Sequence, residues 1–158
     1  MNYIYKIRQN ITGEIMKDIM CSKIIVLDVN TSLEEIAKTM KKYDIGFIPI
    51  SENNKIIGVI TDRDIVVKIL ANKDNKLKGY LSKPISIDIN SNINKVLDVM
   101  KKNKIKRVLV TENNKLIGII SLSDIISKNI DIKETIKEIY SIKKNDDDYE
   151  TKVDDFIL

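Results

Sequence analysis

The hydrophobic pattern of this chain predicts short strands that alternate with amphipathic helices. Beyond residue 30, apolar side chains recur every three or four positions, which is typical of a helix with one buried face. These side chains are Leu33, Ile36, Ala37 and Met40. Two apolar runs follow, at 47–50 and 56–60, and the Asn53-Asn54 pair between them suits the positive φ of a two-residue hairpin turn.

A strand at 22–28 before this segment and a helix at 62–71 after it complete a β-α-β-β-α unit. The unit occurs twice, because a shift of sixty positions aligns 18–65 with 78–125 without a gap, and about 18 of 48 positions are identical. Neither copy alone buries enough apolar surface to be stable in water. We therefore predict an α+β fold in which the two repeats pack sheet to sheet with pseudo-twofold symmetry.

Capping patterns set the expected boundaries of the remaining helices. Thr12 is placed to cap a helix that runs through Met20, and Thr31 with Glu34 forms a capping box. Asp131 with Glu134 predicts a C-terminal helix with Ile132, Ile136, Ile139 and Tyr140 on one face. The expected organisation is an N-terminal arm (1–11), a first repeat (12–75), a second repeat (76–130), and a C-terminal helix with an acidic and apolar tail (131–158), in which 145–148 forms a loop.

Composition narrows the possible functions. The 27 Lys and Arg are spread along the 158 residues among 23 Asp and Glu, which favours a mixed surface over a nucleic-acid stripe. With no histidine and only Cys21, the usual zinc ligand sets and histidine catalysis are absent. No nucleophile–base pair or Walker-type loop occurs, so we expect no enzyme activity. The sequence also lacks a signal-like or membrane-spanning apolar run, so we expect a soluble, cytoplasmic protein.

The strongest chemical candidate is a duplicated segment at a strand-to-helix junction. It reads Gly58-Val59-Ile60-Thr61-x-x-Asp64 in the first copy and Gly118-Ile119-Ile120-Ser121-x-x-Asp124 in the second. An ionised Asp accepts hydrogen bonds from a ribose diol, and the hydroxyl and free N–H groups beside it suit a phosphate or ribose oxygen. The alternative is that both segments are capping boxes that require no ligand.

With this duplication and these motifs, residues 12–130 resemble a tandem pair of CBS (cystathionine β-synthase) domains, a Bateman module, of the stand-alone bacterial or archaeal type. Members of that family are non-catalytic regulatory modules, so the resemblance implies a sensor of AMP, ADP or ATP that requires no cofactor. It also implies a homodimer, to which Val66, Val67, Ile69 and Leu70 contribute, and an unknown protein partner that contacts the C-terminal helix and tail. The alternatives are a sensor of S-adenosylmethionine or a dinucleotide, or an interaction protein whose clefts are unused.

The resemblance implies two clefts, each joining the Asp segment of one repeat to the first strand and the start of the second strand of the other. The first cleft would contain Val59, Thr61, Arg63, Asp64, Ile85, Ile105, Lys106 and Arg107. The second would contain Ile25, Ile45, Gly46, Phe47, Ile119, Ser121, Ser123 and Asp124.

The two clefts differ in charge. Lys106 and Arg107 stand where phosphate-contacting basic residues occur in the gamma subunits of AMP-activated protein kinase, so the first cleft is expected to hold a nucleotide phosphate. Phe47 offers the second cleft an aromatic face without a cation, which favours an uncharged adenosyl group or an empty site. The alternative for Lys106 and Arg107 is a solvated strand start, and for Arg63 it is a surface ion pair with Asp62.

Overall fold

The computed structural model describes residues 13–141, which form two compact units. One unit consists of residues 21–86, and the other combines residues 13–20 with residues 87–141. Thr12, the expected loop at 145–148 and the apolar end of the expected tail lie outside the described residues. The predicted packing of one repeat on the other stays a prediction.

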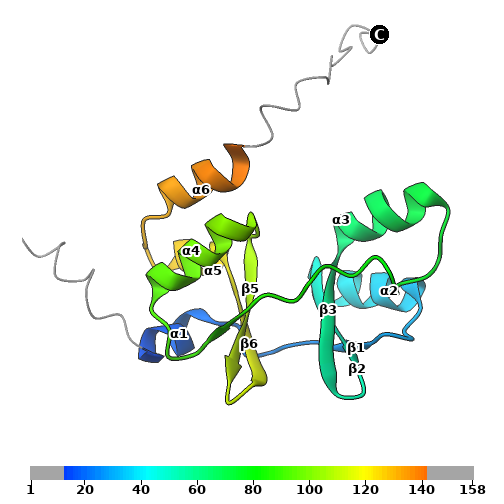
Figure 1. Cartoon of the computed structure of the whole chain (residues 1–158), viewed down its shortest axis with the longest axis horizontal. Helices are drawn as coiled ribbons and strands as arrows, with labels where there is room; N and C mark the ends of the chain where they lie inside the picture. The colour runs from blue at the N-terminus through cyan, green and yellow to red at the C-terminus, as the bar shows by residue number, and fades with distance from the viewer. Residues whose placement is uncertain (1–12, 142–158) are drawn as a thin grey trace, which may run out of the picture. The chain divides into compact units, whose positions relative to one another are not determined.

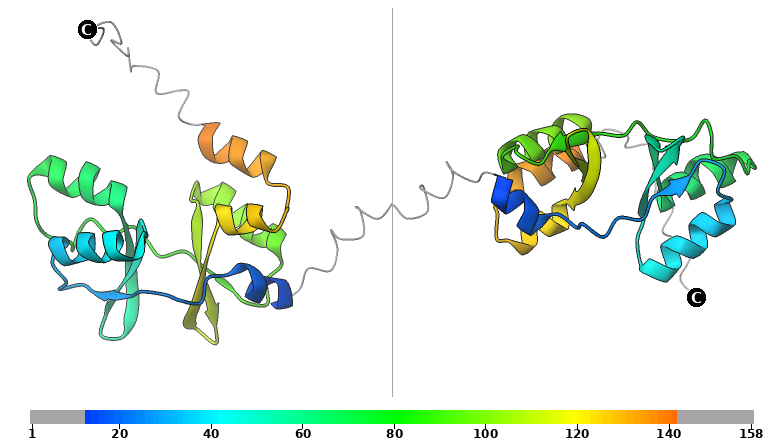
Figure 2. Two further views of the ribbon diagram at one scale, coloured as in Figure 1. Left: turned by 180° about the vertical axis from the view of Figure 1, so that it is seen from behind. Right: turned by 90° about the horizontal axis from the view of Figure 1, so that it is seen from below.

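The predicted β-α-β-β-α order is confirmed in both repeats, and in each unit the helices cover one face of a three-stranded sheet (Figure 1). The elements of the first repeat are β1 (Leu27–Asp28), α2 (Leu33–Tyr43), β2 (Phe47–Glu52), β3 (Lys55–Thr61), α3 (Asp62–Asp64), a π-helical turn (Ile65–Ile69) and a 3₁₀ turn (Leu70–Asn72). Those of the second repeat are β4 (Ser86–Asp88), α4 (Ile93–Asn103), β5 (Arg107–Glu112), β6 (Lys115–Ser121) and α5 (Leu122–Ser127). Outside the repeats lie α1 (Gly13–Ile19) and α6 (Lys133–Tyr140), which both belong to the unit of the second repeat (Figure 2).

The hairpins form as the sequence predicts. Asn53 and Asn54 both have positive φ, at 51° and 62°, and Asn113 and Asn114 repeat this geometry at 49° and 62°. Two consecutive positive φ values match the right-handed twist of the flanking strands, which pair antiparallel. The turns therefore fix the register that brings the far ends of each hairpin together.

The core of the first repeat lies between its sheet and its helices. Ile36 and Met40 of the predicted helical stripe are buried, while Ala37 is exposed. The buried cluster consists of Val29, Ile36, Met40, Ile48, Ile50, Ile60, Ile65, Ile69 and Leu77. Ile69 is fully buried, so its expected place on a dimer surface is wrong, whereas Val66, Val67 and Leu70 are each at least half exposed.

Three boundary predictions are wrong for local reasons. Asp131 and Glu134 form no capping box, since Ile132 is the N-cap of α6 without a side-chain hydrogen bond and Asp131 Oδ1 accepts from the Lys133 N–H at 3.0 Å. Ser32, not Thr31, caps α2: the Glu35 backbone N–H donates to Ser32 Oγ at 3.2 Å, while the Thr31 N–H donates to the Asp28 carbonyl in a preceding turn. The first strand of each repeat is also shorter than expected, because only its last two or three residues form a strand beside β2 or β5.

The segment before β4 pairs with β3. Ser82 pairs with Val59 of β3 through two backbone hydrogen bonds of 3.0 Å. Gly58 leaves room for this segment, since a Cβ there would lie 2.7 Å from the Cβ of Leu81. In the other unit Met20, just after α1, lies against Gly118 of β6 in the same way. Each repeat's last strand is therefore flanked by the segment that leads into the other repeat's first strand.

Candidate functional site

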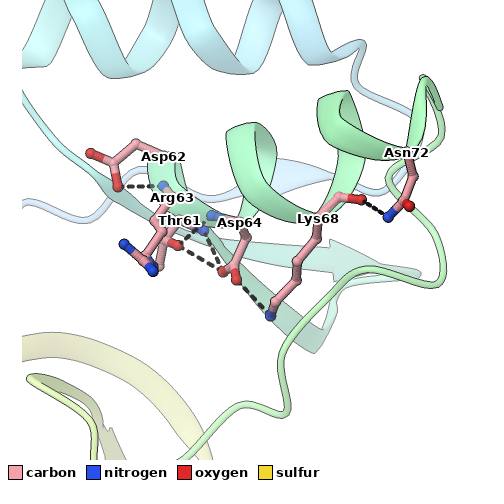
Figure 3. Close-up of polar contacts among 6 residues, drawn as sticks. All are labelled: Thr61, Asp62, Arg63, Asp64, Lys68 and Asn72. Atoms are coloured by element: carbon pink, nitrogen blue, oxygen red, sulfur yellow. Dashed lines mark hydrogen bonds and ion pairs between the residues drawn. The ribbon is translucent and has the colours of Figure 1, made fainter. Parts of the chain in front are cut away.

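Both Asp segments are complete capping boxes. In the first repeat the Asp64 backbone N–H donates to Thr61 Oγ1 at 3.0 Å. Oδ2 of Asp64 accepts from the Thr61 N–H at 3.1 Å and from the Thr61 hydroxyl at 2.7 Å (Figure 3). The capping interpretation is thus correct for the local structure, and a ligand can use only the polar atoms that the capping boxes leave unpaired.

The second oxygen of Asp64 is already paired. Lys68 Nζ lies 2.6 Å from Oδ1 (Figure 3), and the Asp64 side chain is only 12% exposed. Burial raises the pKa of Asp64, but hydrogen bonds from Lys68 and Thr61 together with the Lys68 charge outweigh burial and hold the pKa below its ordinary value. The carboxylate is therefore ionised, and both of its oxygens have partners.

In the second repeat one carboxylate oxygen stays available. Oδ2 of Asp124 accepts from the Ser121 N–H at 2.7 Å and from the Ser121 hydroxyl at 2.6 Å. Oδ1 has no hydrogen bond or ion pair among the described residues, because α5 ends at Ser127 and Lys128 lies just beyond the helix. Asp124 thus keeps a free acceptor that Asp64 lacks.

Of the two serine hydroxyls beside Asp124, one is fully hydrogen-bonded and the other is available to a ligand. Ser121 Oγ donates to Asp124 and accepts from the Asp124 backbone N–H at 3.2 Å. Ser121 and Ser123 are joined by an Oγ–Oγ contact of 2.7 Å, and because the Ser121 proton goes to Asp124, Ser123 is the donor. Ser121 therefore has no capacity left, whereas the exposed Ser123 keeps two lone pairs and can turn its proton toward a ligand.

Each repeat brings the start of its own second strand to its own Asp segment. Arg107 pairs with Ser121, and the Leu122 N–H donates to the Lys106 carbonyl at 3.0 Å. The first repeat has the same arrangement, with Phe47 paired to Thr61. The expected clefts combine these parts only across repeats, although counting outward from the Asn-Asn turns reaches the same register. The predicted combinations across repeats stay predictions.

The position equivalent to Lys106 carries no basic side chain in the first repeat. Gly46 stands there, and a Cβ on it would lie 2.8 Å from Oδ2 of Asp62. In the second repeat the residue equivalent to Asp62 is the buried Leu122. The strand start is consequently acidic in the first repeat and basic in the second. The predicted alternative for Arg63 does not hold, because its guanidinium forms no ion pair with Asp62 among the described residues.

A pocket of about 220 Å³ lies at the basic strand start. It combines cationic, hydroxyl and apolar side chains from β5, β6, α5 and α6. Its lining consists of Lys106, Arg107, Ser121, Leu122, Ser123, Ile126, Ile136 and Tyr140. The Lys106 ammonium lies over the Tyr140 ring, 4.5 Å from its centroid, a contact the sequence analysis missed because it depends on where α6 packs.

The other predicted site residues are apolar and at least half-buried. Val59 is buried beside Ser82, three residues before Ile85. Ile25, Ile45, Ile85, Ile105 and Ile119 are half-buried. Among residues 13–141 there is no cluster of three or more His, Cys, Asp or Glu suited to a metal ion, and no helix there has the length and apolarity to cross a membrane.

Comparison with known proteins identifies a family and similar proteins in two bacteria. The profile of the CBS domain matches residues 16–71 and again 77–131. The YlbB protein of Bacillus subtilis (strain 168) is 32% identical over 116 residues, which cover 70% of this chain and 78% of YlbB. Hypoxic response protein 1 of Mycobacterium tuberculosis (strain H37Rv) is 32% identical over 115 residues, covering 69% and 80%.

Two solved structures are similar in fold. The CBS domain pair of protein MJ0100, in complex with 5′-methylthioadenosine and S-adenosyl-L-methionine, has 28% identity and a TM-score of 0.67, and the match covers 73% of this chain and 98% of that one. Hypoxic Response Protein I with two coordinated zinc ions has 31% identity and a TM-score of 0.64, with coverage of 73% and 98%.

Proposed function

Because the chain belongs to the CBS domain family through two tandem domains, we propose that it is a regulatory module that binds an adenine nucleotide. CBS domain pairs are regulatory ligand-binding modules and generally not catalysts. In this proposal the nucleotide occupies the second repeat, with its phosphate at Lys106 and Arg107 and its ribose at Asp124.

The observation that carries the proposal is the difference between the two Asp segments. Asp124 has a free carboxylate oxygen beside a strand start with two cations, while Asp64 has both oxygens paired beside an acidic strand start. A ribose hydroxyl needs a free acceptor, and a phosphate needs cationic donors. Only the second repeat offers both, so the phosphate is assigned there instead of beside Thr61 and Asp64.

The choice of a nucleotide over S-adenosylmethionine also follows from charge. The MJ0100 complex supports an adenosyl ligand for this fold. The sulfonium of S-adenosylmethionine is cationic and would meet Lys106 and Arg107 at short range, whereas a phosphate is attracted by them. AMP, ADP and ATP are therefore the preferred ligands.

The first repeat supplies the second part of the proposal, a surface for association. Val66, Val67 and Leu70 project from the helix after β3 with exposures of 59%, 50% and 56%. Three exposed apolar side chains within five residues favour burial against a second copy of the chain. We assign this face to a homodimer, whose ligand-dependent packing acts on a separate protein partner.

Titration calorimetry with AMP, ADP, ATP and S-adenosylmethionine tests the function. The full chain is expected to bind at least one of the three nucleotides, and more tightly than S-adenosylmethionine. Lys106→Ala should remove most of that affinity, because it deletes a charge-assisted bond to phosphate. Lys102→Ala, a change at an exposed lysine of α4, is the matched control and should bind as the unaltered chain does. Failure of all three nucleotides to bind would refute the proposal.

A further inference from the structure

We propose that α6 is a displaceable cover of the pocket in the second repeat, so that nucleotide binding and docking of α6 exclude one another. This inference rests on the proposed function and adds its regulation. α6 lies beyond both segments that match the CBS domain.

Two side chains of α6 form one wall of the pocket. Ile136 and Tyr140, at 36% and 40% exposure, line it together with the basic strand start. The Tyr140 ring also makes a cation–π contact with the Lys106 ammonium, which lies 4.5 Å from the ring centroid. The group we assign to the phosphate is therefore engaged by α6 when the helix is docked.

The size of the pocket supports exclusion. With α6 docked the pocket holds about 220 Å³, whereas sites for ligands of nucleotide size span roughly 300–1,000 Å³. A phosphate fits this space, whereas the ribose and base of a nucleotide extend beyond it. A whole nucleotide requires one wall to move, and α6 is the wall that lies outside the β-α-β-β-α unit.

The attachment of α6 is suited to release. Its buried side chains Thr135 and Ile139 are few, and it packs on α4 beside an ion pair of 3.9 Å between Lys101 and Glu138. A helix of eight residues is not stable in water alone, so it is helical because it is docked. Ile132, 5% exposed, anchors the segment before the helix and would keep α6 close after release.

The competition favours the ligand once it is present. A cation–π contact at a partly exposed site is weaker than a charge-assisted hydrogen bond to phosphate. A nucleotide that engages Lys106 thus removes the cation–π contact between Lys106 and Tyr140. Release of α6 then exposes its apolar face, formed by Ile136, Ile139 and Tyr140, to a partner.

Three variants of the full chain test the cover by calorimetry with ADP. Tyr140→Ala removes the wall and the contact to Lys106, and Ile139→Ala weakens docking on α4 without altering a pocket side chain. Both are expected to bind ADP about three- to tenfold more tightly, since less of the protein is in the covered state. Tyr43→Ala is the matched control, because Tyr43 also lies under a lysine, Lys42 at 5.1 Å, but is in the other unit and away from the pocket. It should bind ADP as the unaltered chain does.

Hydrogen exchange gives the second readout. Saturating ADP is expected to speed amide exchange in residues 136–140 of the unaltered chain. Slower or unchanged exchange there, or weaker ADP binding by Tyr140→Ala or Ile139→Ala, would overturn the cover while leaving the proposed function intact. If ADP bound neither the unaltered chain nor the variants, ADP would be excluded as the ligand, and the proposal that α6 covers an ADP site would be refuted as well.

Discussion

Lys68 Nζ lies 2.6 Å from Oδ1 of Asp64, and the equivalent contact is missing from the second repeat as the structure describes it. The difference comes from the length of the helix. Helical structure continues past Lys68 in the first repeat, so a residue four positions after the Asp lies on the same face. In the second repeat α5 ends at Ser127, and Lys128 lies beyond that face. One helical turn thus decides which Asp can accept a ligand.

Replacing each Asp by Asn tests this consequence. Asp124→Asn should weaken nucleotide binding roughly 10- to 150-fold, because a hydrogen bond to a charged group contributes about 1.5–3 kcal/mol. Asp64→Asn should change binding less than threefold, about 0.6 kcal/mol. Calorimetry on both variants gives the comparison. If Asp64→Asn were the one to abolish binding, the ligand would belong to the first repeat.

Asp64 should instead govern stability at low pH. Because its folded-state pKa is lowered, its stabilising effect is complete above the unfolded-state pKa of about 3.9 and is lost as pH falls through the folded-state value. Asp64→Asn should therefore cost about 0.5–2 kcal/mol at pH 7, and the difference from the unaltered chain should shrink below pH 4. Urea unfolding across this range measures it. An equal difference at pH 7 and pH 3 would contradict the role of the ion pair.

The apolar surface of the first repeat predicts different results for neighbouring residues. Val67→Glu should convert a dimer to a monomer with little loss of stability, because Val67 is half exposed. Ile69→Ala should leave the association unchanged and cost about 2–5 kcal/mol, because Ile69 is fully buried. Light scattering and thermal unfolding separate the two effects. A monomeric unaltered chain would remove the assignment of this face.

Gly58 tests the pairing of β3 with the segment before β4. Gly58→Ala places a methyl group 2.7 Å from Leu81 Cβ and 3.2 Å from the Ser82 carbonyl oxygen, so the segment must shift. We expect a loss of about 1–3 kcal/mol in unfolding free energy. Gly118→Ala is the milder comparison, since the flexible Met20 side chain it meets can turn away. Equal stability of Gly58→Ala and the unaltered chain would show that the segment is not held there.

The sequence predicts the parts of this fold that depend on local patterns. The repeat follows from identical spacing, the hairpins from Asn pairs, and the helices from apolar stripes. The sequence does not predict features that depend on which group competes best for a partner. The hydroxyl of Ser32 and not that of Thr31 caps α2, and Ser82 pairs with Val59 instead of extending β4.

The places of the candidate site residues in the fold follow from the sequence, whereas their part in ligand binding stays a prediction. Asp64 and Asp124 lie in the first helical turn after a strand, and Lys106 and Arg107 lie at the start of β5, as the motifs indicate. Their availability depends on Lys68 and on Tyr140, and these contacts arise from helix length and from the docking of α6. Neither is encoded in the spacing of the motif itself.

A crystal structure of the full chain with ADP is the most direct test of the nucleotide site in the second repeat. If the nucleotide binds in the second repeat, phosphate oxygens will lie within hydrogen-bond distance of Lys106 Nζ and Ser123 Oγ, and a ribose hydroxyl will donate to Oδ1 of Asp124. Phosphate bound beside Thr61 and Asp64, with the pocket of the second repeat empty, would contradict it.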